Sequence, residues 1–187
     1  MLKGILQYAH HLLEESVAKG ETVVDATCGN GNDTLFLSEV VGEKGHVLAF
    51  DIQEQAIAVT QEAITKEGKT NISLIHDSHA NIKTYLSNEA ELGGAIFNLG
   101  YLPRSDKSVI TKPNSTIKAM DNILSLLKKG KLLILVVYHG HEGGKKEKQA
   151  ILKHVAELKQ NEYSVLRYGF INQKNNPPFI IAIQKKQ

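Results

Sequence analysis

A glycine-containing turn between an apolar strand and a helix constrains the fold of this chain more than any other segment. The turn reads Asp25-Ala-Thr-Cys-Gly-Asn-Gly-Asn-Asp33, and it follows two valines and leads into Thr34 and the apolar residues 35–37. This order predicts a strand, a tight turn and a helix. Gly29 and Gly31 have no side chains, so the backbone of the turn can come close to a ligand. The segment therefore predicts an α/β fold that binds a ligand where its first strand ends.

A second acid at a fixed distance indicates what kind of ligand this is. Asp51 ends another apolar run, His46-Val-Leu-Ala-Phe-Asp51, twenty-two residues after Gly29. A carboxylate at the end of the neighbouring strand is well placed to accept hydrogen bonds from the two hydroxyls of a ribose. We therefore expect a cofactor that contains a nucleoside.

Two cofactors fit this outline, and the residues after Gly31 distinguish them. A dinucleotide site needs a third glycine where this chain has Thr34. Asp33 also puts a negative charge at the start of a helix, where a pyrophosphate needs positive potential. The same charge suits S-adenosylmethionine, which carries a sulfonium and an amino group. The segment resembles motif I of class I methyltransferases, with Thr27 at the first glycine position; an NAD-dependent oxidoreductase and a ligand-free turn are the alternatives.

The apolar periodicity gives the order of elements along the chain. Strands are predicted over 22–28, 46–52, 72–77, 94–98, 131–138, 163–170 and 179–184. Helices are predicted over 2–19, 33–41, 55–66, 80–86, 114–129 and 145–159. The last two strands must pair antiparallel, because the loop between them is too short for a crossover helix. The pattern predicts one Rossmann-like α/β domain over residues 1–187. Its architecture is that of class I methyltransferases: a seven-stranded, mostly parallel sheet with a C-terminal antiparallel hairpin and helices on both faces.

Charge is divided unevenly between the two halves of the chain. Residues 1–93 contain six Lys and Arg against fourteen Asp and Glu, whereas residues 94–187 contain sixteen against six. A basic half beside an acidic cofactor-binding half suits a polyanionic substrate and favours nucleic acid. The alternative is that these lysines only solvate helix faces.

Composition also bears on the compartment. Cys28 is the only cysteine, which excludes an internal disulfide and fits a reducing cytoplasm. No apolar run approaches the roughly 20 residues of a membrane span, and the N-terminus lacks a signal-peptide pattern. We expect a cytoplasmic protein without membrane association, and the sequence is compatible with a homodimer.

Polar residues follow each predicted parallel strand at its carboxyl end, where this architecture puts its chemistry. The third strand is followed by Asp77-Ser-His79, the fourth by Asn98-Leu-Gly-Tyr101 and the fifth by Tyr138-His-Gly-His141. The residues predicted to bind the cofactor are Asp25, Gly29, Asn30, Gly31, Asn32, Asp33, Asp51, Gln53, Asp77, Ser78 and His79.

The segment Asn98-Leu-Gly-Tyr101 resembles motif IV of amino-methyltransferases, in which two prolines stand where this chain has Leu99 and Gly100. The resemblance implies that the Asn98 carbonyl accepts a hydrogen bond from a substrate amine. It implies that Tyr101 stacks on the base or covers the forming cation. The alternative is a turn asparagine and a tyrosine at the edge of the core. Methylation at C5 of a pyrimidine is disfavoured, since it needs a cysteine nucleophile and Cys28 lies inside the cofactor turn.

Taken together, these motifs resemble the MnmM (YtqB-like) family of small bacterial class I enzymes once labelled rRNA methylases. The matching segments are Asp25-Ala-Thr-Cys-Gly-Asn-Gly-Asn-Asp-Thr34, His76-Asp-Ser-His79, Asn98-Leu-Gly-Tyr-Leu-Pro-Arg-Ser-Asp-Lys107 and Tyr138-His-Gly-His-Glu-Gly-Gly144. The resemblance implies methylation of the 5-aminomethyl group of the wobble uridine, position 34, in tRNA. This base is usually 2-thiolated, and the product is 5-methylaminomethyl-2-thiouridine. Methylation of rRNA or of a small amine stays open as an alternative.

Such a substrate amine is protonated at neutral pH and must lose a proton before it can attack. Asp106 and His139 are the candidate proton acceptors, with Asn98 and Tyr101 as the other catalytic candidates. His139 and His141 alone make a weak metal site, because no third ligand has a clear spacing, and we expect no metal.

Basic residues near the predicted active rim are candidates for contact with the phosphates of a tRNA anticodon stem-loop. Three lie on the polar loop that follows the fourth strand, and two begin a later helix. They are Arg104, Lys107, Lys112, Lys145 and Lys146.

Overall fold

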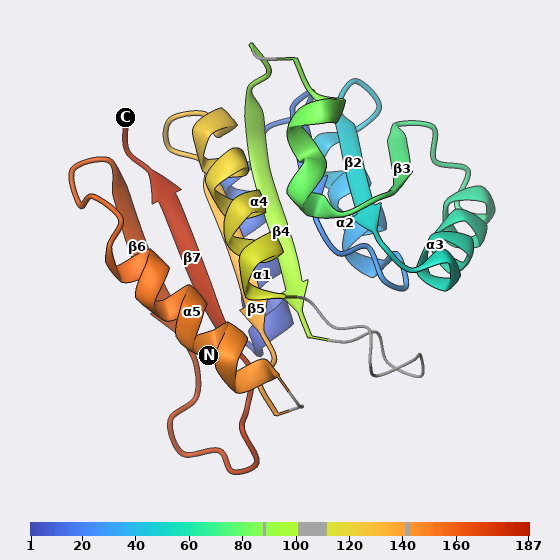
Figure 1. Cartoon of the computed structure of the whole chain (residues 1–187). Coiled ribbons are helices and arrows are strands. Elements are labelled where there is room, and N and C mark those ends of the chain that lie inside the picture. The colour runs from blue at the N-terminus through green and yellow to red at the C-terminus, as the bar shows by residue number, and fades with distance from the viewer. Residues whose placement is uncertain (88, 101–111, 141–142) are drawn as a thin grey trace.

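A computed structural model of the chain describes residues 1–87, 89–100, 112–140 and 143–187 (Figure 1). In these residues seven strands form one sheet with helices on both faces. The strands are β1 (Thr22–Asp25), β2 (His46–Asp51), β3 (Ile72–His76), β4 (Leu92–Leu99), β5 (Leu132–Val137), β6 (Tyr163–Tyr168) and β7 (Phe179–Lys185). The helices are α1 (Ile5–Ser16), α2 (Asn32–Val41), α3 (Glu54–Lys66), the 3₁₀ helix η1 (His79–Tyr85), α4 (Pro113–Leu126) and α5 (Gly144–Ala156).

The strand order is β3-β2-β1-β4-β5-β7-β6, and it confirms the Rossmann-like class I methyltransferase fold. β1 to β5 are parallel, while β7 runs antiparallel to both β5 and β6. The chain runs outward from β1 to β3 and then returns to β4 on the other side of β1. Ligands bind at such a reversal, beyond the carboxyl ends of the strands.

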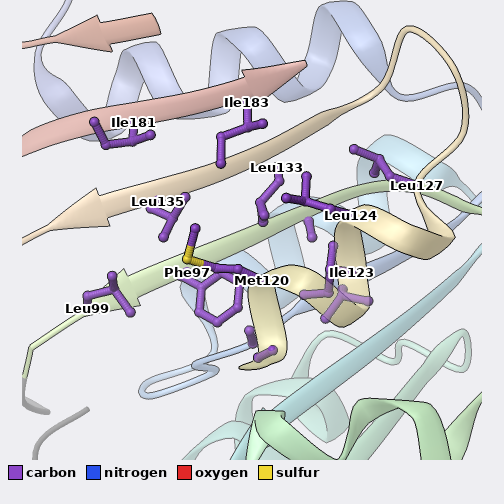
Figure 2. Close-up of a cluster of buried hydrophobic side chains, with 14 of the residues drawn as sticks. Phe97, Leu99, Met120, Ile123, Leu124, Leu127, Leu133, Leu135, Ile181 and Ile183 are labelled. Atoms are coloured by element: carbon purple, nitrogen blue, oxygen red, sulfur yellow. The ribbon is translucent and has the colours of Figure 1, made fainter. Parts of the chain in front are cut away.

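Apolar residues cover both faces of the sheet. One cluster joins the sheet to η1, α4 and α5, and Figure 2 shows Met120 and Ile123 of α4 facing Phe97 and Leu133 of the sheet. The other cluster packs α1, α2 and part of α3 on the opposite face. Residues 133–137 of β5 are buried, as expected of a central strand that is covered on both faces.

The observed elements differ from the predicted ones mainly at their ends. β1 stops at Asp25 rather than at residue 28, because the chain leaves the ladder to form the turn. α1 is shorter at both ends than the predicted 2–19, and the predicted helix over 80–86 is a 3₁₀ helix that begins at His79. No helix in the described ranges has the length and apolarity needed to cross a bilayer.

Asp25 ends β1 as a fully buried carboxyl beneath the turn. The Thr34 hydroxyl donates to one of its oxygens at 2.6 Å, and the backbone N–H of Thr27 donates to the other at 3.1 Å. Burial raises the pKa of Asp25 to about 7, and the negative charge of Asp33 adds to this rise. Asp25 therefore holds the turn in place at a cost, because its ionised form is poorly solvated.

Replacing Asp25 with Asn should remove a pH dependence of stability. The pKa of Asp25 is about 7 in the folded chain and near 4 when unfolded, so its contribution to stability is full below pH 4 and is lost as the pH rises to 7. Between pH 5 and pH 8 the free energy of unfolding of the wild type should fall by roughly 1–3 kcal/mol more than that of Asp25→Asn. Urea unfolding at both pH values measures this difference. The exposed-site variant Glu62→Gln is the control, and equal falls in wild type and Asp25→Asn would contradict the prediction.

Candidate active site

A cavity of about 640 Å³ opens at the carboxyl ends of the first five strands. Its volume is in the range of small-molecule and cofactor sites. Most of the residues predicted from the sequence to act at the site lie on its wall: Gly29, Asn30, Asn32, Asp33, Asp51, Gln53, Asp77, Ser78, His79, Asn98 and Lys112.

The turn after β1 forms one side of this cavity. Gly29 and Gly31 have φ angles of 53° and 81°, a region that favours glycine. A Cβ on Gly31 would lie 3.2 Å from the side chain of Thr60 in α3, so the glycine also lets the turn pack closely. The Thr60 hydroxyl donates to the carbonyl of Gly29 at 3.1 Å. Gly31 therefore shapes the turn without lining the cavity.

Asp51 links the turn to the end of β2. One carboxylate oxygen accepts a hydrogen bond from the backbone N–H of Gly29 at 3.0 Å. The other accepts one from the backbone N–H of Gln53 at 3.0 Å. Each oxygen keeps a further lone pair, and the side chain lies on the cavity wall. This arrangement can accept hydrogen bonds from a ribose diol.

Asp77, after β3, is fixed against the wall by its own neighbours. The Tyr85 hydroxyl donates to it at 2.8 Å and the Ser78 N–H at 2.6 Å. These hydrogen bonds hold the pKa of Asp77 below its ordinary value, and the one from Tyr85 has the larger effect. The carboxylate therefore remains ionised at neutral pH.

His79 has a buried ring with one nitrogen left unused. Its Nδ1 donates to the carbonyl of Ala26 at 2.9 Å, and its Nε2 has no hydrogen-bond partner among the described residues. Burial lowers the pKa of His79, so the ring is neutral and Nε2 is an acceptor. A buried acceptor without a partner is costly, so this nitrogen carries a free-energy penalty in the described structure.

Asn98, at the end of β4, is held from two directions. Its backbone N–H donates to the Thr27 hydroxyl at 2.7 Å, and its side-chain Nδ2 donates to a carboxylate oxygen of Asp33. The other oxygen of Asp33 accepts from Nε2 of His10, in α1, at 2.6 Å. Thr27 stands where motif I has its first glycine, and its hydroxyl ties the cofactor turn to β4. This contact explains the departure from the motif.

Apolar and aromatic side chains surround the mouth of the cavity. Leu6 of α1, Ile52 after β2 and Tyr138 after β5 line it, and all three are partly open to solvent. The pKa of Tyr138 is raised, mainly by partial burial and to a smaller extent by the nearby negative charge of Asp33. Its hydroxyl therefore stays protonated.

The charge on the cavity wall favours a cationic ligand. Asp33, Asp51 and Asp77 line it, against the single basic residue Lys112 among the described lining residues. This balance fits S-adenosylmethionine and opposes a pyrophosphate. Burial raises the pKa of the Cys28 thiol, so this residue is protonated and a poor nucleophile. No group of His, Cys, Asp and Glu suited to a metal occurs in the part of the chain that the structure describes.

Besides Gly31, four other predicted site residues lie away from the cavity wall. Asp25 is buried beneath the turn and acts on the site through Thr34 and Thr27. His139 is buried, and its Nε2 donates to the carbonyl of Pro177 at 3.2 Å, which favours a structural role over the predicted one as proton acceptor. Lys145 and Lys146 are exposed on the first turn of α5. The candidates outside the described residues are Tyr101, Arg104, Asp106, Lys107 and His141.

Three residues contribute to the site although the sequence gives little sign of them. In the sequence Tyr138 is one of several polar residues at a strand end, and Thr27 is a departure from a glycine pattern. His10 gave no signal at all, because it is one polar residue on a helix that precedes both motifs.

Known proteins with similar sequences and structures show which family the chain belongs to. Residues 47–184 match the family described as "Putative rRNA methylase", and residues 4–81 match protein-L-isoaspartate(D-aspartate) O-methyltransferase. The tRNA (mnm(5)s(2)U34)-methyltransferase, chloroplastic, of Arabidopsis thaliana is 33% identical over 98% of this chain and 70% of its own length.

Two solved structures are similar over 99% of both chains. A protein from Clostridium thermocellum with the same rRNA-methylase description is 41% identical, with a TM-score of 0.96. A protein from Streptococcus mutans, solved in complex with SAH, is 42% identical, with a TM-score of 0.91. The chain therefore belongs to the rRNA methylase family and is a methyltransferase.

Proposed function

We propose that this S-adenosylmethionine-dependent enzyme methylates the 5-aminomethyl group of uridine 34 in tRNA, giving 5-methylaminomethyl-2-thiouridine or its oxygen analogue. The observation that carries the proposal is Asn98, an amide fixed by an acid at the edge of an acid-lined cofactor cavity. The wobble uridine is suggested by the similarity to the chloroplast tRNA methyltransferase. We further propose that the enzyme acts in the cytoplasm.

The cofactor supplies an electrophilic methyl group on a positively charged sulfur. We propose that Asp51 accepts hydrogen bonds from the ribose hydroxyls and that His79 forms part of the wall against which the cofactor lies. The acidic wall of the cavity stabilises the positive charge. The remaining proposed contacts are those of the turn and of the strand ends, from Gly29, Asn30, Asn32, Asp33, Gln53, Asp77 and Ser78.

Asn98 has the chemistry to orient a substrate amine. Its NH₂ group donates to Asp33, so its carbonyl oxygen lies on the other edge of the amide, where it can accept a hydrogen bond from an amine N–H. An in-line displacement depends on alignment of this kind, and misplacement by about 1 Å can cost 10²-fold in rate. The apolar groups Leu6, Ile52 and Tyr138 exclude water from the approaching ammonium and so favour its loss of a proton.

Basic side chains are proposed to bind the phosphates of the anticodon stem-loop. Lys112 lines the cavity, and Lys145 and Lys146 begin α5. Arg104 and Lys107 stay candidates for the same role from the sequence alone.

A second candidate, methylation of rRNA, is favoured by the description of the matching family. Purified enzyme with isotopically labelled S-adenosylmethionine should be offered tRNA that carries 5-aminomethyl-2-thiouridine, unmodified rRNA and a free alkyl amine. Mass spectrometry of the nucleosides should find the label in the wobble base of tRNA. Label in rRNA or the free amine, with none in tRNA, would refute the proposed substrate.

Asn98→Ala should separate catalysis from cofactor binding. The variant loses the carbonyl that orients the amine but keeps the acids of the cavity, so kcat should fall by roughly 100-fold or more. The Kd for S-adenosylhomocysteine, measured by calorimetry, should stay within about 3-fold of wild type. Asn114→Ala, at an exposed position of α4, is the matched control. A parallel loss of cofactor affinity would show that Asn98 binds cofactor rather than substrate.

Lys145→Ala together with Lys146→Ala should weaken tRNA binding without slowing the chemistry. Each lysine that contacts a phosphate releases counterions, so the slope of log affinity against log salt should shrink by about 0.7–0.9 per lost contact. Filter binding of tRNA at several salt concentrations measures the slope. Lys153→Ala, later on the same helix, is the control. An unchanged slope would mean that the start of α5 lies outside the tRNA interface.

A further inference from the structure

A single carboxylate connects the N-terminal helix to the amide at the proposed reaction centre. One carboxylate oxygen of Asp33 accepts a hydrogen bond from Nε2 of His10 at 2.6 Å. The other oxygen accepts a hydrogen bond from the side-chain Nδ2 of Asn98. The three residues come from α1, α2 and β4, and Asp33 and Asn98 both line the cavity. The chain of contacts therefore runs from outside the cavity to its wall.

His10 is held in the orientation that this contact requires. Its ring stacks on Phe36 of α2, with 3.8 Å between ring centroids and an angle of 6°. The side chain of His10 is 29% exposed and that of Asp33 is 11% exposed, so the pair is only partly open to water. His11, the next residue, contacts Glu15 of its own helix at 3.4 Å instead.

The direction of these hydrogen bonds fixes which edge of the Asn98 amide faces Asp33. An ionised carboxylate can only accept, so the NH₂ group of Asn98 must point to it and the carbonyl must lie on the opposite edge. If the Asn98 amide were flipped, its NH₂ group would face the substrate amine. Both groups carry N–H donors, so the hydrogen bond from the amine to Asn98 would be lost. An Asp33 carboxylate free to rotate would hold the amide less firmly, and His10 restricts that rotation.

We propose that His10 is a positioning residue that acts through Asp33 to keep the carbonyl of Asn98 turned toward the substrate amine. This inference rests on the proposed amine substrate, and His10 is not among the described residues that line the cavity.

Two substitutions at His10 separate its hydrogen bond from its packing. His10→Phe keeps a ring against Phe36 but has no donor, whereas His10→Gln has an N–H that can reach Asp33. His10→Phe should lower kcat by about 10-fold or more, with KM for tRNA and for S-adenosylmethionine within about 2-fold of wild type. His10→Gln should recover most of kcat, and His11→Ala is the control on the same helix. An unchanged kcat in His10→Phe, or a loss that Gln does not recover, would overturn the proposal.

A spectroscopic measurement tests the same contact without turnover. In ¹⁵N-labelled protein the side-chain NH₂ protons of Asn98, assigned by their loss in Asn98→Ala, should resonate at low field because of the bond to Asp33. They should move upfield in His10→Phe, stay in place in His11→Ala, and return in His10→Gln, with Tm close to wild type throughout. Identical resonances in wild type and His10→Phe would overturn the proposal. If the wild type does not methylate tRNA, the proposed substrate fails, while these resonances still decide the role of His10.

Discussion

Hydrogen bonds between the turn after β1 and the ends of its two neighbouring strands hold this site together. On the β2 side, the Cys28 N–H donates to the carbonyl of Phe50 at 2.8 Å and the Gly29 N–H donates to Asp51. On the β4 side, the Asn98 N–H donates to Thr27. The turn therefore cannot shift without moving both the acid proposed to bind ribose and the amide proposed to bind the amine. This coupling suits a reaction in which two bound molecules must be aligned.

The same arrangement concentrates negative charge. Asp25, Asp33 and Asp51 lie around one turn. The raised pKa of Asp25 indicates that this burial and concentration of negative charge destabilises the folded state. The cost is limited because every one of these carboxylates accepts hydrogen bonds, Asp25 from Thr34 and Asp51 from two backbone N–H groups. A cationic cofactor would offset much of the remaining repulsion, as expected where a site trades stability for binding.

The fold and the cofactor half of the site were predictable because their signals are local. Apolar runs that end in a polar residue mark the carboxyl ends of strands, and this pattern located Asp51 and Asn98 correctly on the cavity wall. The same pattern does not show which polar residue at a strand end faces the cavity, and His139 is an example. Successive side chains at a strand end point to opposite sides, so Tyr138 faces the cavity while His139 packs against Phe179. The contact between His10 and Asp33 spans 23 residues and depends on how α1 packs on the sheet, which no local pattern records.

The buried thiol of Cys28, within the cofactor turn, affects how readily the enzyme is oxidised. Peroxides and disulfides react with thiolate, and burial keeps the lone cysteine in its protonated form. A chain with one such sulfur offers neither a disulfide partner within itself nor a ready sulfenic acid. Methyl transfer at this site should therefore continue unchanged when the reducing power of its surroundings falls.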